Sequence, residues 1–438
     1  MYKLLVFLIF SYLFLRANSF TPKGRIAHSS ILHQNMIYIF GGYYGNSCTN
    51  EVFHLDIYQN FNAEYPQWTE NSAIGFESCW ATTVITHHNN NPTIYLIGGI
   101  MQNQNFEDSF ASIIYTYSLS TRQWNIPVTV GKLPERRRDI QAVADHMGNI
   151  YIFGGVADKY LGSEDLKFFN DMVIFNADYL TWSYGPIVNA PLKRHAYTAT
   201  LLSSGMIVYI GGREQTDNGN LREVDINQIN LYDTKLGSWS VVQAKSKYKI
   251  DSRRLHSAVL APDENIIIYG GAMYFDRVKV TPDLAVLNTQ TIPFEWNVPQ
   301  ITSNVGQVPS LAAHSANLYE KYMFVAFGNI TQSNAPPLID TNSRVYMLDI
   351  SNFTWVNHFE TEHTSTDESP PDPTMSPTMN TSEDHSKHLM QISQMKIIIA
   401  TISSICGVAI FLVTGIVSYK FYHKRKQCET VGISGNDA

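Results

Sequence analysis

The sequence predicts an all-β fold, a six-bladed β-propeller, followed by a disordered stalk and one C-terminal transmembrane helix. Three observations predict it. A pair of glycines closes an apolar run at intervals of 56 to 59 residues, tryptophan recurs at the same interval, and one long apolar run stands near the C-terminus. Of the 438 residues, 12% are aromatic and only 16% are charged, which favours β structure together with a membrane segment.

The glycine and tryptophan repeats define the blades. The glycine pairs are Gly41-Gly42, Gly98-Gly99, Gly154-Gly155, Gly211-Gly212 and Gly270-Gly271. A sixth copy has Gly328 at the first position and Asn329 in place of the second glycine. The tryptophans are Trp68, Trp124, Trp182, Trp239, Trp296 and Trp355. Runs rich in Tyr, Phe, Ile and Val before and after each glycine pair give four short strands per unit. Six such sheets, packed radially, bury the faces that one sheet alone leaves exposed.

Both ends of the chain predict a single-pass type I membrane protein. Lys3, an apolar run and the small residues before position 20 fit a signal peptide of residues 1–19. Residues 397–419 carry no charge and, as a helix, extend about 34 Å, enough to span a membrane. The basic tail, residues 420–438, belongs on the cytoplasmic side, which places the propeller outside the cell or in a lumen. Residues 360–396, rich in Ser, Thr, Pro and acidic residues, predict an extended, O-glycosylated stalk.

The double glycine, the aromatic strand that ends in Asp, as in Val52-Phe53-His54-Leu55-Asp56, and the late tryptophan together resemble kelch repeats. The resemblance implies a kelch propeller of the galactose oxidase/kelch superfamily over residues 20–359. Its blades would lie at approximately 24–70, 78–126, 136–184, 193–241, 252–298 and 310–359. It also implies that the glycines allow close backbone approach near the hub and that the tryptophans pack between blades. The membrane-anchored layout resembles attractin-like and muskelin-like propellers more than cytosolic kelch adaptors.

Cysteine and asparagine residues predict covalent modifications of the outer part. Cys48 and Cys79 are the two cysteines before the predicted membrane helix, so in an oxidising compartment we expect a disulfide between them, with two free buried thiols as the alternative. Sequons at Asn329, Asn352 and Asn380 predict N-glycosylation, and Asn380, in the stalk, is the site we expect first.

Arginine and histidine at the start of the innermost strands are candidate ligand-binding residues. Aligned on the glycines, these starts read Arg25-x-x-His28, Cys79-x-x-Thr82, Arg138-x-x-Gln141, Arg194-x-x-Tyr197, Arg253-x-x-His256 and Leu311-x-x-His314. Because innermost strands surround the central channel, the four arginines and three histidines predict a basic channel mouth for carboxylate or phosphate groups. In the alternative interpretation, the same side chains hold adjacent loops through hydrogen bonds to carbonyl groups.

The sequence favours recognition over catalysis. A net charge of −7 argues against nucleic acid as a partner, and the chain has no Gly-x-Ser-x-Gly elbow, phosphate-binding loop or HExxH motif. We therefore expect no catalytic residue, no metal and no cofactor. The predicted function is a non-enzymatic surface or lumenal scaffold that binds protein or glycan through loops such as 101–112, 157–170 and 213–227. The alternatives are a copper-dependent oxidase resembling galactose oxidase, and a glycosylated structural protein of the surface.

Overall fold

The computed structural model describes residues 20–57, 61–88, 91–102, 112–273, 278–332 and 340–359, all within one compact unit, Met1–His363. The predicted signal peptide, stalk, transmembrane segment and tail, with Asn380, lie outside these residues. Across the described ranges, no helix has both the length and the apolar character needed to cross a membrane.

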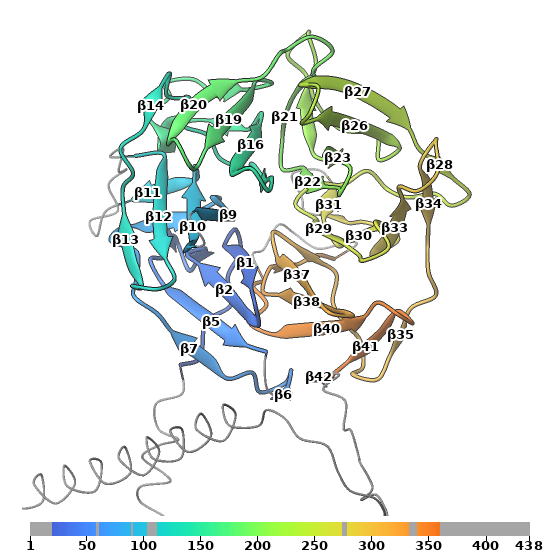
Figure 1. The fold of residues 1–438 in the computed structure, drawn as a ribbon. Coiled ribbons are helices and arrows are strands. Elements are labelled where there is room, and N and C mark those ends of the chain that lie inside the picture. The colour runs from blue at the N-terminus through green and yellow to red at the C-terminus, as the bar shows by residue number, and fades with distance from the viewer. Residues whose placement is uncertain are drawn as a thin grey trace, which may run out of the picture. The chain divides into compact units, whose positions relative to one another are not determined.

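Six sheets are arranged in a ring around a central axis, which confirms the predicted propeller (Figure 1). Blades 1 to 3 are β1 (Ser29–His33), β2 (Met36–Phe40), β5 (Val52–Asp56) and β7 (Trp68–Glu70); β9 (Thr82–His88), β10 (Asn91–Ile97), β12 (Ile114–Ser118) and β13 (Gln123–Asn125); and β15 (Ala142–Ala144), β16 (Asn149–Phe153), β19 (Met172–Asn176) and β20 (Thr181–Tyr184). Blades 4 to 6 are β22 (Thr198–Leu201), β23 (Met206–Ile210), β26 (Gln228–Asp233) and β27 (Ser238–Gln243); β29 (Ser257–Leu260), β30 (Ile266–Tyr269), β33 (Leu284–Asn288) and β34 (Glu295–Asn297); and β37 (Ser315–Tyr319), β38 (Tyr322–Ala326), β40 (Val345–Asp349) and β41 (Thr354–Val356).

Three blades carry a fifth strand at the outer edge. It comes from the connection that enters the blade and pairs in parallel with the outermost strand. These edge strands are β14 (Val130–Gly131) on β20, β28 (Lys245–Ser246) on β34 and β35 (Thr302–Ser303) on β41.

The hydrophobic cores lie between blades, because successive side chains of a strand point to opposite faces. In β2, Ile37 and Ile39 pack into the core shared with blade 6, whereas Tyr38 and Phe40 pack into the core shared with blade 2. Six such cores join the six blades, and each holds one repeat tryptophan at the interface with the preceding blade. The tryptophan period thus reports the blade period.

The ring closes without exchange of a strand between the first and last blades. The N–H of Gly328 donates to the carbonyl of Arg25 at 2.8 Å, and Asn317 Nδ2 donates to Ser30 Oγ at 2.8 Å. Both ends of the propeller also attach to blade 1. Phe20 forms an isolated bridge with Trp68, and β42 (His358–Phe359) pairs with β6 (Phe61–Asn62).

Beyond the glycine pairs, each blade carries a small sheet built on the connection between its second and third strands. In blades 2, 4 and 6 this sheet also includes a strand from the segment before the innermost strand. We call these six sheets the loop crown. They are β3 (Tyr43–Tyr44) with β4 (Ser47–Cys48); β11 (Ile100–Gln102) with β8 (Glu77–Cys79); β17 (Val156–Ala157) with β18 (Lys167–Phe168), which flank η1 (Lys159–Leu161); β24 (Arg213–Gln215) with β25 (Leu221–Glu223) and β21 (Lys193–His195); β31 (Ala272–Met273) with β32 (Val278–Lys279); and β39 (Asn329–Ile330) with β36 (Leu311–Ala312).

Candidate functional site

One residue per blade, just before the innermost strand, has a left-handed backbone with φ between 52° and 58°. These residues are Ala27, Trp80, Asp139, Ala196, Leu255 and Ala313. Each donates its N–H to the carbonyl of the equivalent residue in the preceding blade, and Ala27 closes the circle by donating to Ala313 at 3.0 Å. A continuous ring of backbone hydrogen bonds therefore encircles the channel.

The glycine pairs form a second ring that runs in the opposite sense. The N–H of each second glycine donates to a carbonyl at the start of the next blade, as Gly42 does to Ser78 at 2.8 Å. In blade 1 the first glycine leaves no room for a side chain, because a Cβ on Gly41 would lie 2.1 Å from that carbonyl oxygen. The glycines thus let neighbouring blades approach at the hub, as the resemblance implied.

Blade 6 departs from the predicted alignment of this pair. Gly328 occupies the second position, because its N–H donates to Arg25 as the other second glycines donate to their partners. Phe327 takes the first position with φ of 60°, and its buried ring packs against Phe53 and Trp68. The prediction that Gly328 stands first and Asn329 second was wrong by one residue.

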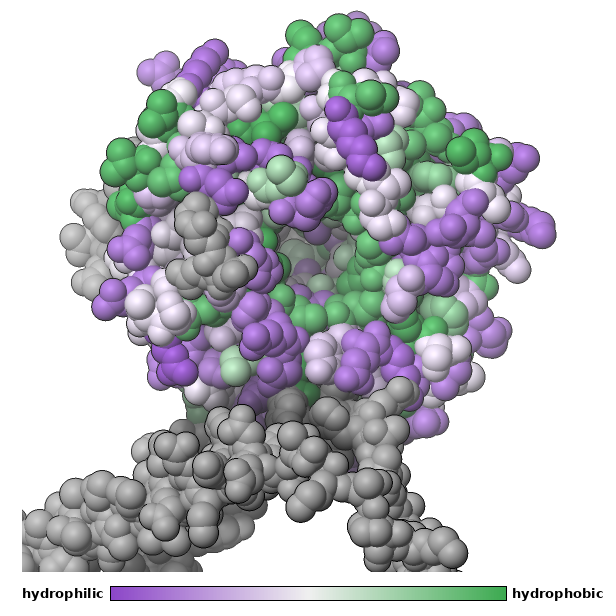
Figure 2. All heavy atoms as spheres, in the orientation of Figure 1, coloured by the Kyte–Doolittle hydropathy of each residue, from purple (hydrophilic) through white to green (hydrophobic). Residues whose placement is uncertain are grey.

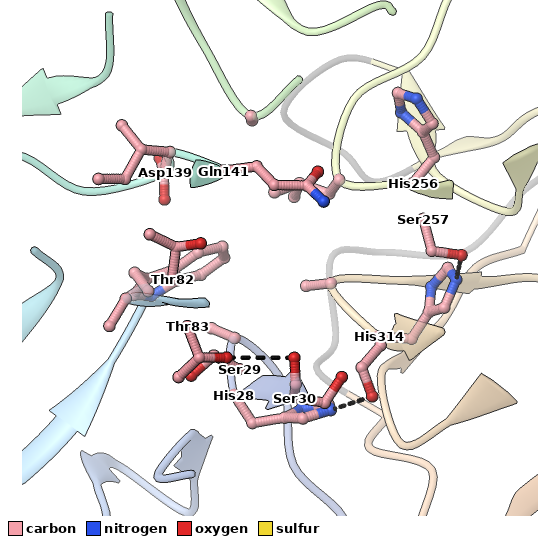
Figure 3. Close-up of a pocket in the computed structure, with 18 of the residues that line it drawn as sticks. His28, Ser29, Ser30, Thr82, Thr83, Asp139, Gln141, His256, Ser257 and His314 are labelled. Atoms are coloured by element: carbon pink, nitrogen blue, oxygen red, sulfur yellow. Dashed lines mark hydrogen bonds between the residues drawn. The ribbon is translucent and has the colours of Figure 1, made fainter. Parts of the chain in front are cut away.

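The rings border a cavity of about 200 Å³ in the channel (Figure 2, Figure 3). Five blades each line it with four consecutive residues at the start of the innermost strand, and blade 4 contributes two, Ala196 and Tyr197. Imidazole and hydroxyl groups link the blades across this wall. His28 Nε2 lies 2.8 Å from Ser315 Oγ, and His314 Nε2 lies 2.8 Å from Ser257 Oγ. His256 Nε2 makes the same contact with Thr198 Oγ1 at 2.9 Å. The predicted histidines therefore do line the channel.

Burial determines the charge of these histidines. It lowers the pKa of His28 and His256 well below the usual value and lowers the pKa of His314 to about 3, because the buried imidazolium loses its hydration. All three are neutral at physiological pH, so the wall that they form carries no positive charge from imidazole.

The predicted arginines lie elsewhere than expected. Arg25, Arg194 and Arg253 are 0% exposed and do not line the cavity. Arg25 Nη1 donates to the carbonyl of Gly41, and Arg253 Nη1 donates to that of Gly270, each at 3.0 Å. Arg194 pairs with the buried Glu214 at 3.2 Å. For Arg25 and Arg253 this is the geometry of the alternative interpretation, in which the guanidinium groups hold the blade backbone, whereas Arg194 binds a side-chain carboxylate. Burial leaves all three out of a ligand's reach.

In blade 3, the equivalent arginine is Arg137 and not Arg138. Arg137 Nη1 donates to the carbonyl of Gly154, 17 residues later, as Arg253 does to Gly270 over the same separation. In blade 1 the arginine and the first glycine are 16 residues apart, because the first hairpin of that blade is one residue shorter. Applying the spacing of blade 1 to blade 3 selected Arg138 in place of Arg137. Arg138 instead binds Asp139 and Asp158, at 2.7 and 2.6 Å.

Asp139 is the functional candidate that sequence reasoning missed. Among the described residues that line the cavity, it is the one carboxylate. Its Oδ2 contacts Arg138 and lies 3.2 Å from His195 Nδ1, while its buried Oδ1 has no hydrogen-bond partner. Burial opposes ionisation, but His195 and Arg138 outweigh it and hold the pKa of Asp139 below its usual value. Asp139 occupies the left-handed position that every blade shares. Only the three-dimensional structure shows that these six positions are equivalent, so the sequence alone did not single it out.

A groove of about 660 Å³ opens in the loop crown between blades 3 and 4. The hairpin of β17 and β18 lines one side, and Lys193 and Gln215 contribute the other. Tyr160 and Leu166 of this hairpin are 45% and 57% exposed. Two predicted contact loops, 157–170 and 213–227, lie here, whereas most of the third, residues 103–111, lies outside the described residues.

The structure joins Cys48 of blade 1 to Cys79 of blade 2 by a disulfide, with Cα atoms 5.3 Å apart. Asn352 is exposed on the turn before Trp355. Asn329 requires a correction as a glycosylation site, because it is 3% exposed and its amide is hydrogen-bonded to the backbone of Ile330 and Asp340. In the part of the chain that the structure describes, no three His, Cys, Asp or Glu side chains are grouped to hold a metal.

Comparison with known proteins agrees with this architecture. A family model described as the Attractin/LZTR1 β-propeller matches residues 10–276. Kelch domain-containing protein 3 of Homo sapiens is 27% identical over 258 residues, which cover 56% of this chain and 64% of that protein. Kelch domain-containing protein 10 of Homo sapiens is 26% identical over 294 residues, which cover 63% and 60%. This chain thus spans a little less than two thirds of the length of these relatives.

The solved structure of YjhT has a TM-score of 0.57 and 13% identity, and the match covers 78% of this chain and 99% of that one. It supports the fold alone. Together with the family match, it confirms the predicted kelch-type propeller.

Proposed function

The chain belongs to the Attractin/LZTR1 β-propeller family, and from this premise we propose that it is a non-enzymatic scaffold that binds a protein through its loop crown. The observation that carries the proposal is the groove between blades 3 and 4, where Leu166 exposes apolar surface beside charged groups. Tyr160, which precedes the lining residue Leu161 in the same hairpin, is also exposed. Apolar anchors within a polar rim are typical of protein recognition sites. A glycan ligand is the second candidate, because the same groove carries the polar side chains Glu164 and Asp165.

We place this scaffold on the outer side of a membrane, in a type I orientation. Two observations support the placement. The disulfide between blades 1 and 2 is of a kind that persists in oxidising compartments, and the sequence signals at both ends of the chain agree on the orientation.

The copper oxidase hypothesis gains no support, because Cys48 and Cys79 are bonded to each other and neither is free to link to a tyrosine.

The test is affinity capture, by the full-length protein, of proteins displayed on cells, followed by cross-linking and mass spectrometry. We expect Tyr160→Ala and Leu166→Ala each to weaken capture by about tenfold, the effect of removing one anchor side chain. The matched control is Tyr179→Ala, an exposed tyrosine at the outer edge of the same blade, which should leave capture unchanged. Equal capture by all three variants would refute the assignment of the groove, and cross-links outside the crown would do the same.

A further inference from the structure

We propose that the central channel binds one primary ammonium group, with the Asp139 carboxylate as its counter-ion and the Trp80 indole as an aromatic wall. The site uses residues of the inner ring and does not rest on the protein ligand proposed for the crown. The chemistry is shared by two sources, a small free amine and the side chain of a lysine on a partner.

The charges around the channel favour a cation. Of the described residues that line the cavity, only Asp139 has a carboxylate, and none is lysine or arginine. Arg138, which binds Asp139, is shared with Asp158 at 2.6 Å, so these three groups together carry one net negative charge. A charge in a cavity with protein walls produces a stronger potential than the same charge on an open surface.

Asp139 has an unused hydrogen-bonding capacity at this site. Its side chain is 7% exposed, and Oδ1 is buried without a partner, whereas Oδ2 contacts Arg138 and His195. An unpaired buried acceptor is unfavourable, so a donor that reaches it is favoured. Rotation about χ2 of an aspartate is soft, which lets Oδ1 turn toward a donor in the cavity. Other buried atoms of the lining also lack a partner, namely Ser29 Oγ on blade 1 and the Nδ1 atoms of His28, His256 and His314.

Trp80 and the size of the cavity select the ligand. Trp80 is the neighbour of Asp139 in the ring, since the Asp139 N–H donates to its carbonyl, and it lines the same cavity. An indole face attracts ammonium but not a neutral group of the same shape. The cavity, about 200 Å³, exceeds the ~150 Å³ that holds benzene in an engineered protein, so an alkylammonium of lysine side-chain length fits.

The experiment is isothermal titration of the full-length protein with n-butylammonium, which reproduces the end of a lysine side chain, and with n-butanol as the neutral control. We expect saturable binding of the amine at one site and none of the alcohol. Asp139→Asn should weaken binding by about tenfold, because it removes the charge and keeps the shape. Asp171→Asn is the matched control. It removes a carboxylate that pairs with Arg137 in the same blade but does not line the cavity, and binding should stay within about twofold.

A second variant keeps the test decisive if Asp139→Asn unfolds. Asp158→Asn leaves the cavity intact but frees Arg138 to neutralise Asp139 alone, so it should also weaken the amine. A capped peptide with one lysine distinguishes the sources. Binding of both probes assigns the site to a partner's lysine as well as to free amines, and binding of butylammonium alone assigns it to small amines. Equal binding of amine and alcohol, equal effects of the Asp139 and Asp171 variants, or no saturable binding of either probe would overturn the proposal.

Discussion

Replacing the first glycine of a pair tests whether close approach of the blades holds the hub together. Gly41→Ala places a Cβ 2.1 Å from the Ser78 carbonyl oxygen, so one backbone must move. The movement breaks the hydrogen bond from Gly42 to Ser78, now 2.8 Å. Because Gly41 has φ of 57°, alanine also bears the cost of a left-handed conformation.

The expected loss of stability has two contributions, the backbone conformation and the lost hydrogen bond. The left-handed conformation costs about 1–2 kcal/mol. Loss of the hydrogen bond, with its acceptor left buried, costs about 1–3 kcal/mol more. We expect Gly41→Ala to lower the free energy of unfolding by about 3 kcal/mol. Gly45→Ala is the matched control, because Gly45, in the crown hairpin that follows Gly41, has φ of 63° but a Cβ there meets no atom within 4 Å.

The assay is urea denaturation of the full-length protein, monitored by tryptophan fluorescence, since each blade interface holds one repeat tryptophan. Gly45→Ala should show the left-handed cost alone, about 1–2 kcal/mol. If the two alanine variants lose the same stability, close approach of the blades is not what requires glycine at position 41, and the description of the second ring fails.

Three further predictions concern the core, the disulfide and acid stability. Trp239→Ala removes a buried side chain from the interface of blades 3 and 4 and should lower the free energy of unfolding by about 3–5 kcal/mol, measured by urea denaturation, with Trp239→Phe losing less. Cys48→Ala opens a loop whose ends are 31 residues apart and should cost about 3–4 kcal/mol in the chain-entropy model; a reducing agent should destabilise the wild type but not this variant. The lowered pKa of Asp139 contributes stability that is present above its unfolded pKa, about 3.9, and is lost as the pH falls through the folded value. Thermal melts of the wild type between pH 7 and 3 should therefore lose stability below about pH 4, and Asp139→Asn should make that loss less steep, whereas an unchanged slope would contradict the assignment.

The blades could be predicted from the sequence because each blade is built from one continuous segment of the chain. Its four strands follow one another in the chain, and each tryptophan lies on the outermost strand of its own blade. Period-2 alternation, glycine pairs and tryptophan spacing are therefore all visible in one dimension. The disulfide also joins neighbouring blades, so the two cysteines lie close in the sequence as well as in space.

The hub could not be derived in the same way because its contacts join residues of different blades. An offset of one residue decides which arginine is buried, and hairpins of unequal length shift that offset between blades 1 and 3. The sequence does not distinguish an arginine whose side chain faces the channel from one whose side chain binds a glycine carbonyl. Only the packed ring shows that Arg25 and Arg253 bind the backbone of their own blades.

The sequence by itself determined the repeat, the blade number and the positions of the tryptophans, because these depend on periods within one chain segment. Only the tertiary structure decided which side chains line the channel. Six residues that share a left-handed backbone come together from positions about 57 residues apart, and their order around the ring places an aspartate beside a tryptophan. Burial then removed the arginines from the wall and the charge from the histidines, since desolvation opposes an uncompensated buried charge.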